Sequence, residues 1–295
     1  MKYILTGGAG DLGQLLYQDL RQNGHEVRIL DMAEKPRAMA ACDYLRGSLT
    51  DRADCRTAAV GRDILIHIAA LHGIHEDQGC DAYDFHDVNV TGTFNIFQAA
   101  AEAGIRKVIL ISSTSVDDRY GLYGHTKILN EEMARAYAAR HDMDIIVLRP
   151  RAFIPPWNRC VYDDFIGWAN WFVKGAVHIQ DVKQAVLKAA EHLKNHTLED
   201  VPILPVDGAY EYTSDDLVNW NDETPSRTYG PERIQLAEGA GIDIRRKPKV
   251  IGHTDAFQKI EYQPKYSLKN LLDDFETYGA AGPPNPAEFR KSGDL

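Results

Sequence analysis

Short apolar runs alternate with helical patterns through the first half of this chain. The predicted strands cover residues 2–6, 27–31, 44–46, 64–68, 108–112 and 145–148. The predicted helices between them include 12–20, with leucines spaced along one face, 85–103 and 123–140. On the helix at 123–140 we expect Glu131, Glu132 and Arg135 to face solvent. Because strands alternating with helices form parallel sheets through right-handed crossovers, we predict a doubly wound α/β fold.

This regular alternation weakens after Pro150. We predict helices at 181–194, 231–240 and 267–278, and one more strand at 201–206. The predicted organisation is a larger domain at 1–150, a smaller lobe at 151–282 that interleaves with the sheet, and a flexible tail at 283–295.

Composition excludes several classes of protein. The 33 Lys and Arg against 43 Asp and Glu give a net charge of −10, which argues against binding a phosphate backbone. We expect no membrane span, since no apolar run approaches roughly 18 residues. The chain starts without the layout of a signal peptide, so we expect a cytoplasmic protein. The cysteines (42, 55, 80 and 160) form no CxxC pair and are expected to be ordinary thiols.

A glycine-rich turn follows the first predicted strand and opens the first helix. Gly7, Gly10 and Gly13 let the backbone turn tightly and approach a pyrophosphate at the helix N-terminus. Asp31 ends the next strand, where a carboxylate binds ribose hydroxyls and repels a 2′-phosphate. We therefore predict NAD as cofactor, with NADP less favoured; Lys35 and Arg37 leave room for it.

A serine, a tyrosine and a lysine have the spacing of an acid–base site. Ser113 follows the fifth strand, and Tyr123 and Lys127 lie at i and i+4 on one helix face. A phenol is a poor base at neutral pH, and a nearby ammonium lowers its pKa. We predict that Ser113 orients a substrate oxygen, Tyr123 exchanges its proton, and Lys127 assists Tyr123.

These motifs make the chain resemble the extended short-chain dehydrogenase/reductases, the NAD-dependent epimerase/dehydratase family. The resemblance runs from about residue 2 to 278 through TGGAGDLG, IHIAA, VNVTGTFN, SSTS, YGHTK, LRP, VHIQDV and YQPKYSLKNLL. It implies a Rossmann-type fold, with Ser113, Tyr123 and Lys127 as catalytic residues. The cofactor-binding residues that it implies are Gly7, Gly10, Asp11, Leu12, Gly13, Asp31, Ser48, Leu49, Ala69, Ala70, Asn89, Tyr123, Lys127 and Pro150.

Asn89 admits two roles: it orders its helix or a water near the cofactor, or it is an ordinary core residue. The chain departs from the family at Ser48, where an aspartate is usual beside the adenine, and at Asp117 and Asp118, which replace the usual Tyr-Gly.

Substrate contacts are predicted at His72, His75, Thr114, Arg151 and Asn158. His72 and His75 follow the fourth strand, at the sheet edge where ligands bind in such folds. The alternative is a solvated loop; a zinc site is weighed and not predicted, so no metal is expected. An arginine suits an anionic group.

The short stretch at 150–177 favours one substrate class over another. Nucleotide-sugar epimerases of the family use a longer stretch there, and the chain is similar to members that oxidise free sugars or sugar acids, such as uronate dehydrogenases. We predict hydride transfer at a hydroxyl of a sugar-like small molecule. The alternatives are a nucleotide-sugar epimerase or dehydratase with tightly bound NAD, and a non-catalytic NAD-binding protein. The helix at 85–103 is apolar on two faces, which favours a homodimer.

Overall fold

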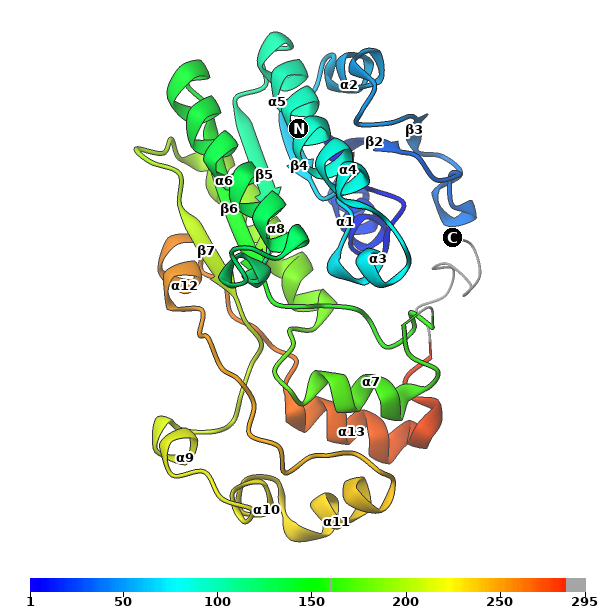
Figure 1. Cartoon of the computed structure of the whole chain (residues 1–295), viewed down its shortest axis with the longest axis vertical. Helices are drawn as coiled ribbons and strands as arrows, with labels where there is room; N and C mark the ends of the chain where they lie inside the picture. The colour runs from blue at the N-terminus through cyan, green and yellow to red at the C-terminus, as the bar shows by residue number, and fades with distance from the viewer. Residues whose placement is uncertain (160, 285–295) are drawn as a thin grey trace. The chain divides into compact units, whose positions relative to one another are not determined.

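A seven-stranded sheet in the order β3-β2-β1-β4-β5-β6-β7 organises the computed structural model, which describes residues 1–159 and 161–284 (Figure 1). The pairings that join β1 to β6 are all parallel, so the predicted doubly wound sheet is confirmed. The strands are β1 (Lys2–Thr6), β2 (Glu26–Asp31), β3 (Asp43–Arg46), β4 (Ile64–His67), β5 (Lys107–Ile111), β6 (Asp144–Pro150) and β7 (Ile203–Val206).

The chain divides into two units. Unit 1 comprises Met1–Pro150 and Ala185–Pro205, and unit 2 comprises Arg151–Gln184 and the described residues from Val206 onward. Cys160 and residues 285–295, most of the predicted tail, lie outside the described residues. The helical elements up to β6 are α1 (Asp11–Gln22), η1 (Arg37–Met39), α2 (Arg52–Ala59), α3 (Gly73–Asp77), α4 (Ala82–Phe85), η2 (His86–Thr91), α5 (Gly92–Glu102), η3 (Thr114–Asp117) and α6 (Leu122–His141).

One face of the sheet carries α2, α5 and α6, with α5 and α6 side by side (Figure 1). Its core joins alternate strand residues to apolar helix residues, among them Leu65, Val108 and Phe97, each fully buried. The order in which strands are added to the sheet reverses at β1: β2 and β3 lie on one side of β1, and β4 to β7 lie on the other. Ligands bind beyond the carboxyl ends of the strands at such a switch point.

The helix predicted at 85–103 is not one regular α-helix. It consists of α4, the π-helical turn η2 and α5. Single π-turns inside helices are frequent at functional sites. This turn carries Asn89, which is fully buried.

Unit 2 is mainly helical and has its own apolar core. Its elements include α7 (Phe165–Phe172), α9 (Ser214–Val218), α10 (Thr224–Tyr229), α11 (Pro231–Gly239), α12 (Thr254–Ile260), α13 (Leu268–Tyr278) and η4 (Gly279–Ala281), while α8 (Ile179–Asn195) runs from unit 2 into unit 1. α7 and α13 lie side by side (Figure 1) and bury Trp168, Phe165 and Leu271 between them and their neighbours. None of the helices in the described part of the chain combines the length and apolar character that crossing a membrane requires.

Candidate active site

The glycine turn between β1 and α1 brings two strand ends together. Gly7 has φ +69°, a conformation that L side chains rarely adopt, and a Cβ there would lie 2.8 Å from the backbone of Ala69. Gly13 packs against the same turn, since its Cβ would lie 2.7 Å from the Gly7 carbonyl oxygen. Glycine at both positions lets the ends of β1 and β4 and the start of α1 meet closely.

Asp31 links the end of β2 to this turn. Its Oδ2 accepts a hydrogen bond from the Ala9 amide at 2.9 Å, and its Oδ1 accepts one from the Ala33 amide at 2.9 Å. A carboxylate has about four lone-pair sites, so two bonds leave capacity for ribose hydroxyls. Asp31 is also only half-buried.

The residues around the turn fit a dinucleotide. In the described chain no side chain caps α1 at Gly10, so an anion can occupy the position that a capping side chain takes elsewhere. A Cβ at Gly10 would have a single close neighbour, the Gly7 oxygen at 3.4 Å, so the packing of the turn does not itself require glycine there. The turn thus offers an open, glycine-lined helix start of the kind that holds a pyrophosphate.

The other predicted cofactor positions differ in exposure. Ala69 and Ala70 are half-buried at the carboxyl end of β4. The Ser48 hydroxyl bonds Thr50 at 2.8 Å, and Leu49 is buried with its carbonyl accepting from Asn95. The remaining predicted positions lie on two elements: Asp11, Leu12 and Gly13 form the first turn of α1, and Pro150 ends β6.

Tyr123 and Lys127 occupy the first turns of α6. The Lys127 ammonium is buried, donates to the Ile111 carbonyl oxygen at 3.0 Å and lies 5.6 Å from the Tyr123 ring centroid. Ile111 ends β5, so the bond fixes the lysine at the carboxyl edge of the sheet.

Burial dominates the electrostatics of this pair. It raises the pKa of Tyr123 to about 12, and the Ser113 hydroxyl acts in the opposite direction. It lowers the pKa of Lys127 to about 8, and the Glu131 carboxylate opposes that shift. The phenol is therefore neutral at pH 7 in this structure. The spacing of Tyr123 and Lys127 predicted a lowered pKa for the phenol; in the folded protein burial has the larger effect and raises it.

Ser113 lies two residues beyond β5 and begins η3. Its Oγ donates to the Ser115 Oγ at 3.0 Å and accepts from the Ser115 amide at 3.0 Å. The next residue, Thr114, is half-buried. The side chains of Ser113, Tyr123 and Lys127 all belong to unit 1 and to the carboxyl side of β5.

His72 and His75 lie at the start of α3, close to the start of α6. The His72 Nδ1 is 3.5 Å from the Tyr123 hydroxyl oxygen, and the His72 amide donates to the His75 Nδ1 at 2.8 Å. The Tyr123 amide also donates to Glu76 at 3.2 Å. Burial of the side chain, followed by the Lys127 charge, lowers the pKa of His72, although the residue as a whole is exposed. A neutral imidazole therefore faces the phenol.

A second neutral histidine lies beneath the site. His67, at the end of β4, contacts the Thr6 hydroxyl at 2.6 Å and the Thr93 hydroxyl at 2.9 Å. Burial, with the Lys127 charge adding to it, lowers the pKa of His67 to about 3. Over residues 1–159 and 161–284, no cluster of three or more His, Cys, Asp or Glu has a metal-binding arrangement.

Asn89 uses its side chain to hold the loop after β4. Its Oδ1 accepts from the Leu71 amide at 2.8 Å, and its Nδ2 donates to the Leu71 carbonyl and the Thr126 hydroxyl, each at 3.0 Å. These contacts account for its burial and tie the loop that carries His72 to α6.

Arg151 and Asn158 belong to unit 2. Arg151 pairs with the fully buried Asp207 at 3.6 Å, and its Nη1 has no hydrogen-bond partner among the described residues. Asp207 also accepts bonds from the Ile251 and Gly252 amides. Asn158 is half-buried, and its amide donates to the Pro155 carbonyl at 3.0 Å.

The expectation that Glu131 faces solvent is wrong. Glu132 and Arg135 are exposed and form an ion pair, but Glu131 is buried and pairs with Arg149. One signal was available in the sequence: Glu131 follows Lys127 by four residues and so shares its helix face.

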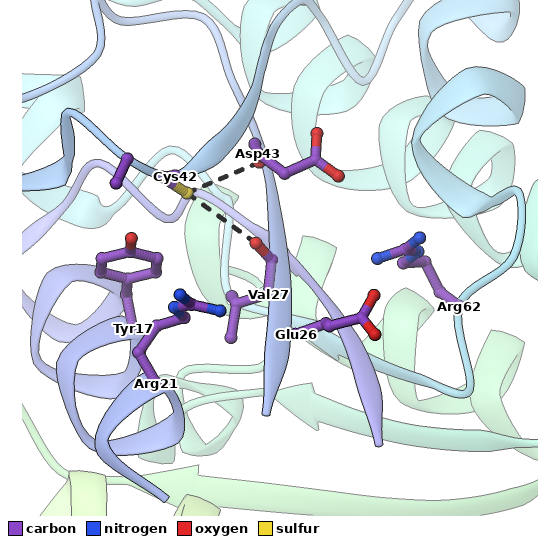
Figure 2. A pocket seen from close by; sticks show the side chains of 8 residues that line it. Tyr17, Arg21, Glu26, Val27, Cys42, Asp43 and Arg62 are labelled. Atoms are coloured by element: carbon purple, nitrogen blue, oxygen red, sulfur yellow. Dashed lines mark hydrogen bonds between the residues drawn. The ribbon is translucent and has the colours of Figure 1, made fainter. Parts of the chain in front are cut away.

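A separate hollow of about 130 Å³ lies at the opposite, amino-terminal edge of the sheet (Figure 2). Its lining residues are Tyr17, Arg21, Glu26, Val27, Ala41, Cys42, Asp43 and Arg62. Burial raises the pKa of the Cys42 thiol to about 11, so this cysteine is a poor nucleophile. The hollow is remote from the chemistry described above.

The parallel sheet, its glycine turn and the Ser–Tyr–Lys group define a dinucleotide-binding α/β protein with the layout of a short-chain dehydrogenase. The model of the NAD dependent epimerase/dehydratase family matches residues 3–166. The chain belongs to this family, within the extended short-chain dehydrogenase/reductase superfamily, as its motifs suggested.

Curated relatives are similar at low identity. The chain is 27% identical over 207 residues to "Uronate dehydrogenase" of Pseudomonas syringae pv. tomato, covering 63% of this chain and 73% of that protein. It is 28% identical over 215 residues to "Sterol demethylase protein B" of Methylococcus capsulatus, covering 63% and 64%. It is 31% identical over 174 residues to a "3 beta-hydroxysteroid dehydrogenase/Delta 5-->4-isomerase" of Mycobacterium tuberculosis, covering 50% and 46%. The chain thus spans less than two thirds of the last two.

Solved structures share the fold. A UDP-galactose 4-epimerase matches with TM-score 0.69 at 20% identity, covering 94% of this chain and 99% of that one. A UDP-glucuronic acid 4-epimerase from Bacillus cereus in complex with NAD matches with TM-score 0.67 at 18% identity, covering 92% and 96%. A short-chain dehydrogenase/reductase superfamily protein from Agrobacterium tumefaciens with bound NAD matches with TM-score 0.68 at 16% identity, covering 94% and 96%.

Proposed function

We propose that this protein is an NAD-dependent dehydrogenase that oxidises a hydroxyl of a sugar or sugar acid. The observation that carries the proposal is the buried Lys127 ammonium beside Tyr123, with Ser113 on the same side of β5. A protein that only binds a dinucleotide needs the glycine turn but not this group.

In this reaction each residue of the site has a separate role. Ser113 orients the substrate oxygen, and Tyr123 accepts the hydroxyl proton when ionised. Lys127 donates to the Ile111 carbonyl and holds a positive charge near the phenol. NAD supplies the hydride acceptor when bound, and its positive ring favours tyrosinate. His72 offers a neutral nitrogen near the phenol for a substrate hydroxyl.

We assign the cofactor as NAD rather than NADP because of Asp31. Its carboxylate repels a 2′-phosphate while it can accept ribose hydroxyls. Lys35, one of the two cations that left NADP open, donates instead to the Ala40 carbonyl at 3.1 Å.

The substrate class is tested with a panel of aldoses, uronic acids and nucleotide sugars in the presence of NAD. We expect reduced NAD to accumulate with a free sugar or sugar acid. The likeness to uronate dehydrogenase and the short stretch at 150–177 support this outcome. If none of the panel reduces NAD although calorimetry shows that NAD binds, the dehydrogenase proposal fails.

The second candidate is a nucleotide-sugar epimerase, favoured by the match of the fold to UDP-sugar 4-epimerases. Such an enzyme regenerates its NAD. It would convert a nucleotide sugar into an isomer without accumulating reduced cofactor, so product analysis beside the absorbance measurement separates the two candidates.

The proposal includes a homodimer formed through α5 and α6. Phe94 on α5 is 44% exposed, and its ring lies 6.4 Å from that of Tyr137 on α6. Tyr137 is buried, so Phe94 is the ring of this pair that α5 offers to a second copy of the chain, and an exposed aromatic residue on a helix suits an isologous interface. Light scattering should give about twice the chain mass of 33.1 kDa, and a species of the chain mass alone would refute the dimer.

A further inference from the structure

Glu131 places a carboxylate inside unit 1, one helical turn beyond Lys127 on α6. Glu131 is only 2% exposed. The Arg149 Nε donates to Oε1 at 2.8 Å and the Arg149 Nη2 donates to Oε2 at 2.5 Å. The Ser112 hydroxyl donates to Oε1 at 2.5 Å. A buried charge persists only where it is paired and hydrogen-bonded, and Glu131 meets both conditions.

The partners of Glu131 come from the strands that end at the site. Ser112 immediately precedes Ser113 after β5, and Arg149 lies in the last two residues of β6. Glu131 itself shares α6 with Tyr123 and Lys127. One carboxylate therefore joins the ends of two strands to the helix that carries the phenol and the amine.

Glu131 also follows Lys127 by four residues on α6, so the two buried side chains share one face of the helix. The titratable groups that face Lys127 are His67 from β4, His72 from the loop before α3, and Tyr123 and Glu131 from its own helix. The pKa of each histidine is lowered, so both are neutral at pH 7. Within the described residues, Glu131 is the anion that acts on Lys127. Arg149 reduces this effect by pairing with the same carboxylate.

We propose that Glu131 is a positioning residue, whose negative charge keeps the Lys127 side chain an ammonium beside Tyr123 and whose bonds to Ser112 and Arg149 fix the Ser113 segment against α6. The role in catalysis rests on the proposed function. The effect on Lys127 does not, because it exists in the free protein.

The test measures the protonation of Lys127 directly. The full chain is labelled with ¹³Cε-lysine, and the Lys127 signal is identified by its loss in Lys127→Arg. Its shift is then followed against pH in the wild type and in Glu131→Gln, which keeps the size of the side chain and an oxygen for Ser112. Glu132→Gln is the matched control, since Glu132 is exposed and forms a surface ion pair with Arg135.

In the wild type the midpoint should lie near pH 8, where burial places the pKa of Lys127. Glu131→Gln should move it down by at least about 0.5 pH unit, which makes the free amine at pH 7 about threefold more abundant. Glu132→Gln should leave it unchanged. Equal midpoints in the wild type and Glu131→Gln would overturn the proposal, whether or not any substrate is turned over.

Two further measurements keep the proposal open to refutation. If Glu131→Gln does not fold, Arg149→Met serves instead, because it leaves the carboxylate without its competing cation and should raise the Lys127 midpoint; an unchanged or lower midpoint overturns the proposal. With a substrate in hand, the alkaline limb of the kcat profile in Glu131→Gln should move to lower pH by the same amount as the Lys127 midpoint. A uniform fall in kcat without that displacement indicates a purely structural role and contradicts the proposal.

Discussion

Gly10→Ala and Gly13→Ala separate two reasons for glycine in a dinucleotide turn. One is close packing of the turn against its own backbone, and the other is space for the pyrophosphate. At Gly13 a Cβ would lie 2.7 Å from the Gly7 carbonyl oxygen and against the backbone of Gly8. Backbone cannot move aside as a flexible side chain does, so α1 must shift away from the turn. Overpacking of this kind costs about 1–3 kcal/mol of the free energy of unfolding.

At Gly10 the same methyl group meets only the Gly7 oxygen, at 3.4 Å. Gly10 has φ −72° and ψ 171°, an extended conformation that alanine adopts without strain. As N-cap of α1, alanine is less favourable than glycine, by about 0.5–1 kcal/mol. The fold of Gly10→Ala should therefore remain close to that of the wild type.

NAD binding should respond differently. A methyl group at Gly10 occupies the open helix start that the pyrophosphate needs, and losing one charge-assisted hydrogen bond costs about 1.5–3 kcal/mol. The Kd for NAD in Gly10→Ala should rise about 10–150-fold, measured by calorimetry. Urea unfolding supplies the stability of each variant.

Gly24→Ala is the control for glycine replacement in general, because Gly24 has positive φ and open space around it, remote from the turn. It should lose some stability and keep the wild-type Kd for NAD. If Gly10→Ala binds NAD as tightly as the wild type, the pyrophosphate does not lie over this turn and the reasoning is refuted.

Two more variants test single residues. Asp31→Ala should weaken NAD binding, since the Ala9 amide loses its acceptor, and should raise the ratio of NADP to NAD affinity at least about tenfold; an unchanged ratio means that Asp31 does not contact the ribose. His67→Gln should flatten the acid side of the stability profile. Because the pKa of His67 falls from 6.5 to about 3 on folding, the unfolded chain binds the extra proton, and stability is lost as pH falls from 6.5 toward 3. Between pH 6.5 and 5 the variant should lose about 1.6 kcal/mol less than the wild type in urea unfolding, and equal losses would contradict a neutral, buried His67.

Local sequence patterns were sufficient to predict the strands of the sheet. The run 2–6 matches β1 at both ends, since an apolar segment followed by glycines has few alternatives to a buried parallel strand. Tyr123 and Lys127 also share a helix face as their spacing requires, because contacts between neighbouring helical turns are local.

Contacts between distant segments escaped the sequence analysis. Glu131 is buried because Arg149 on β6 and Ser112 just after β5 converge on it, and helix spacing alone does not reveal such partners. Asn89 in the π-turn η2 likewise bonds the Leu71 backbone, a contact across 18 residues. In unit 2, Asp207 binds Arg151 and two backbone amides of a segment more than 40 residues away, so the partner of Arg151 was not predictable from neighbouring residues.

The central claim is that the Tyr123 phenol exchanges the proton while a hydride passes to NAD. Turnover of Tyr123→Phe with the best substrate of the panel tests it most directly, since this change removes one oxygen atom. In this variant kcat should fall about 10²–10⁴-fold, while calorimetry should give a Kd for NAD within about threefold of the wild type. A variant that turns over as fast as the wild type would contradict it.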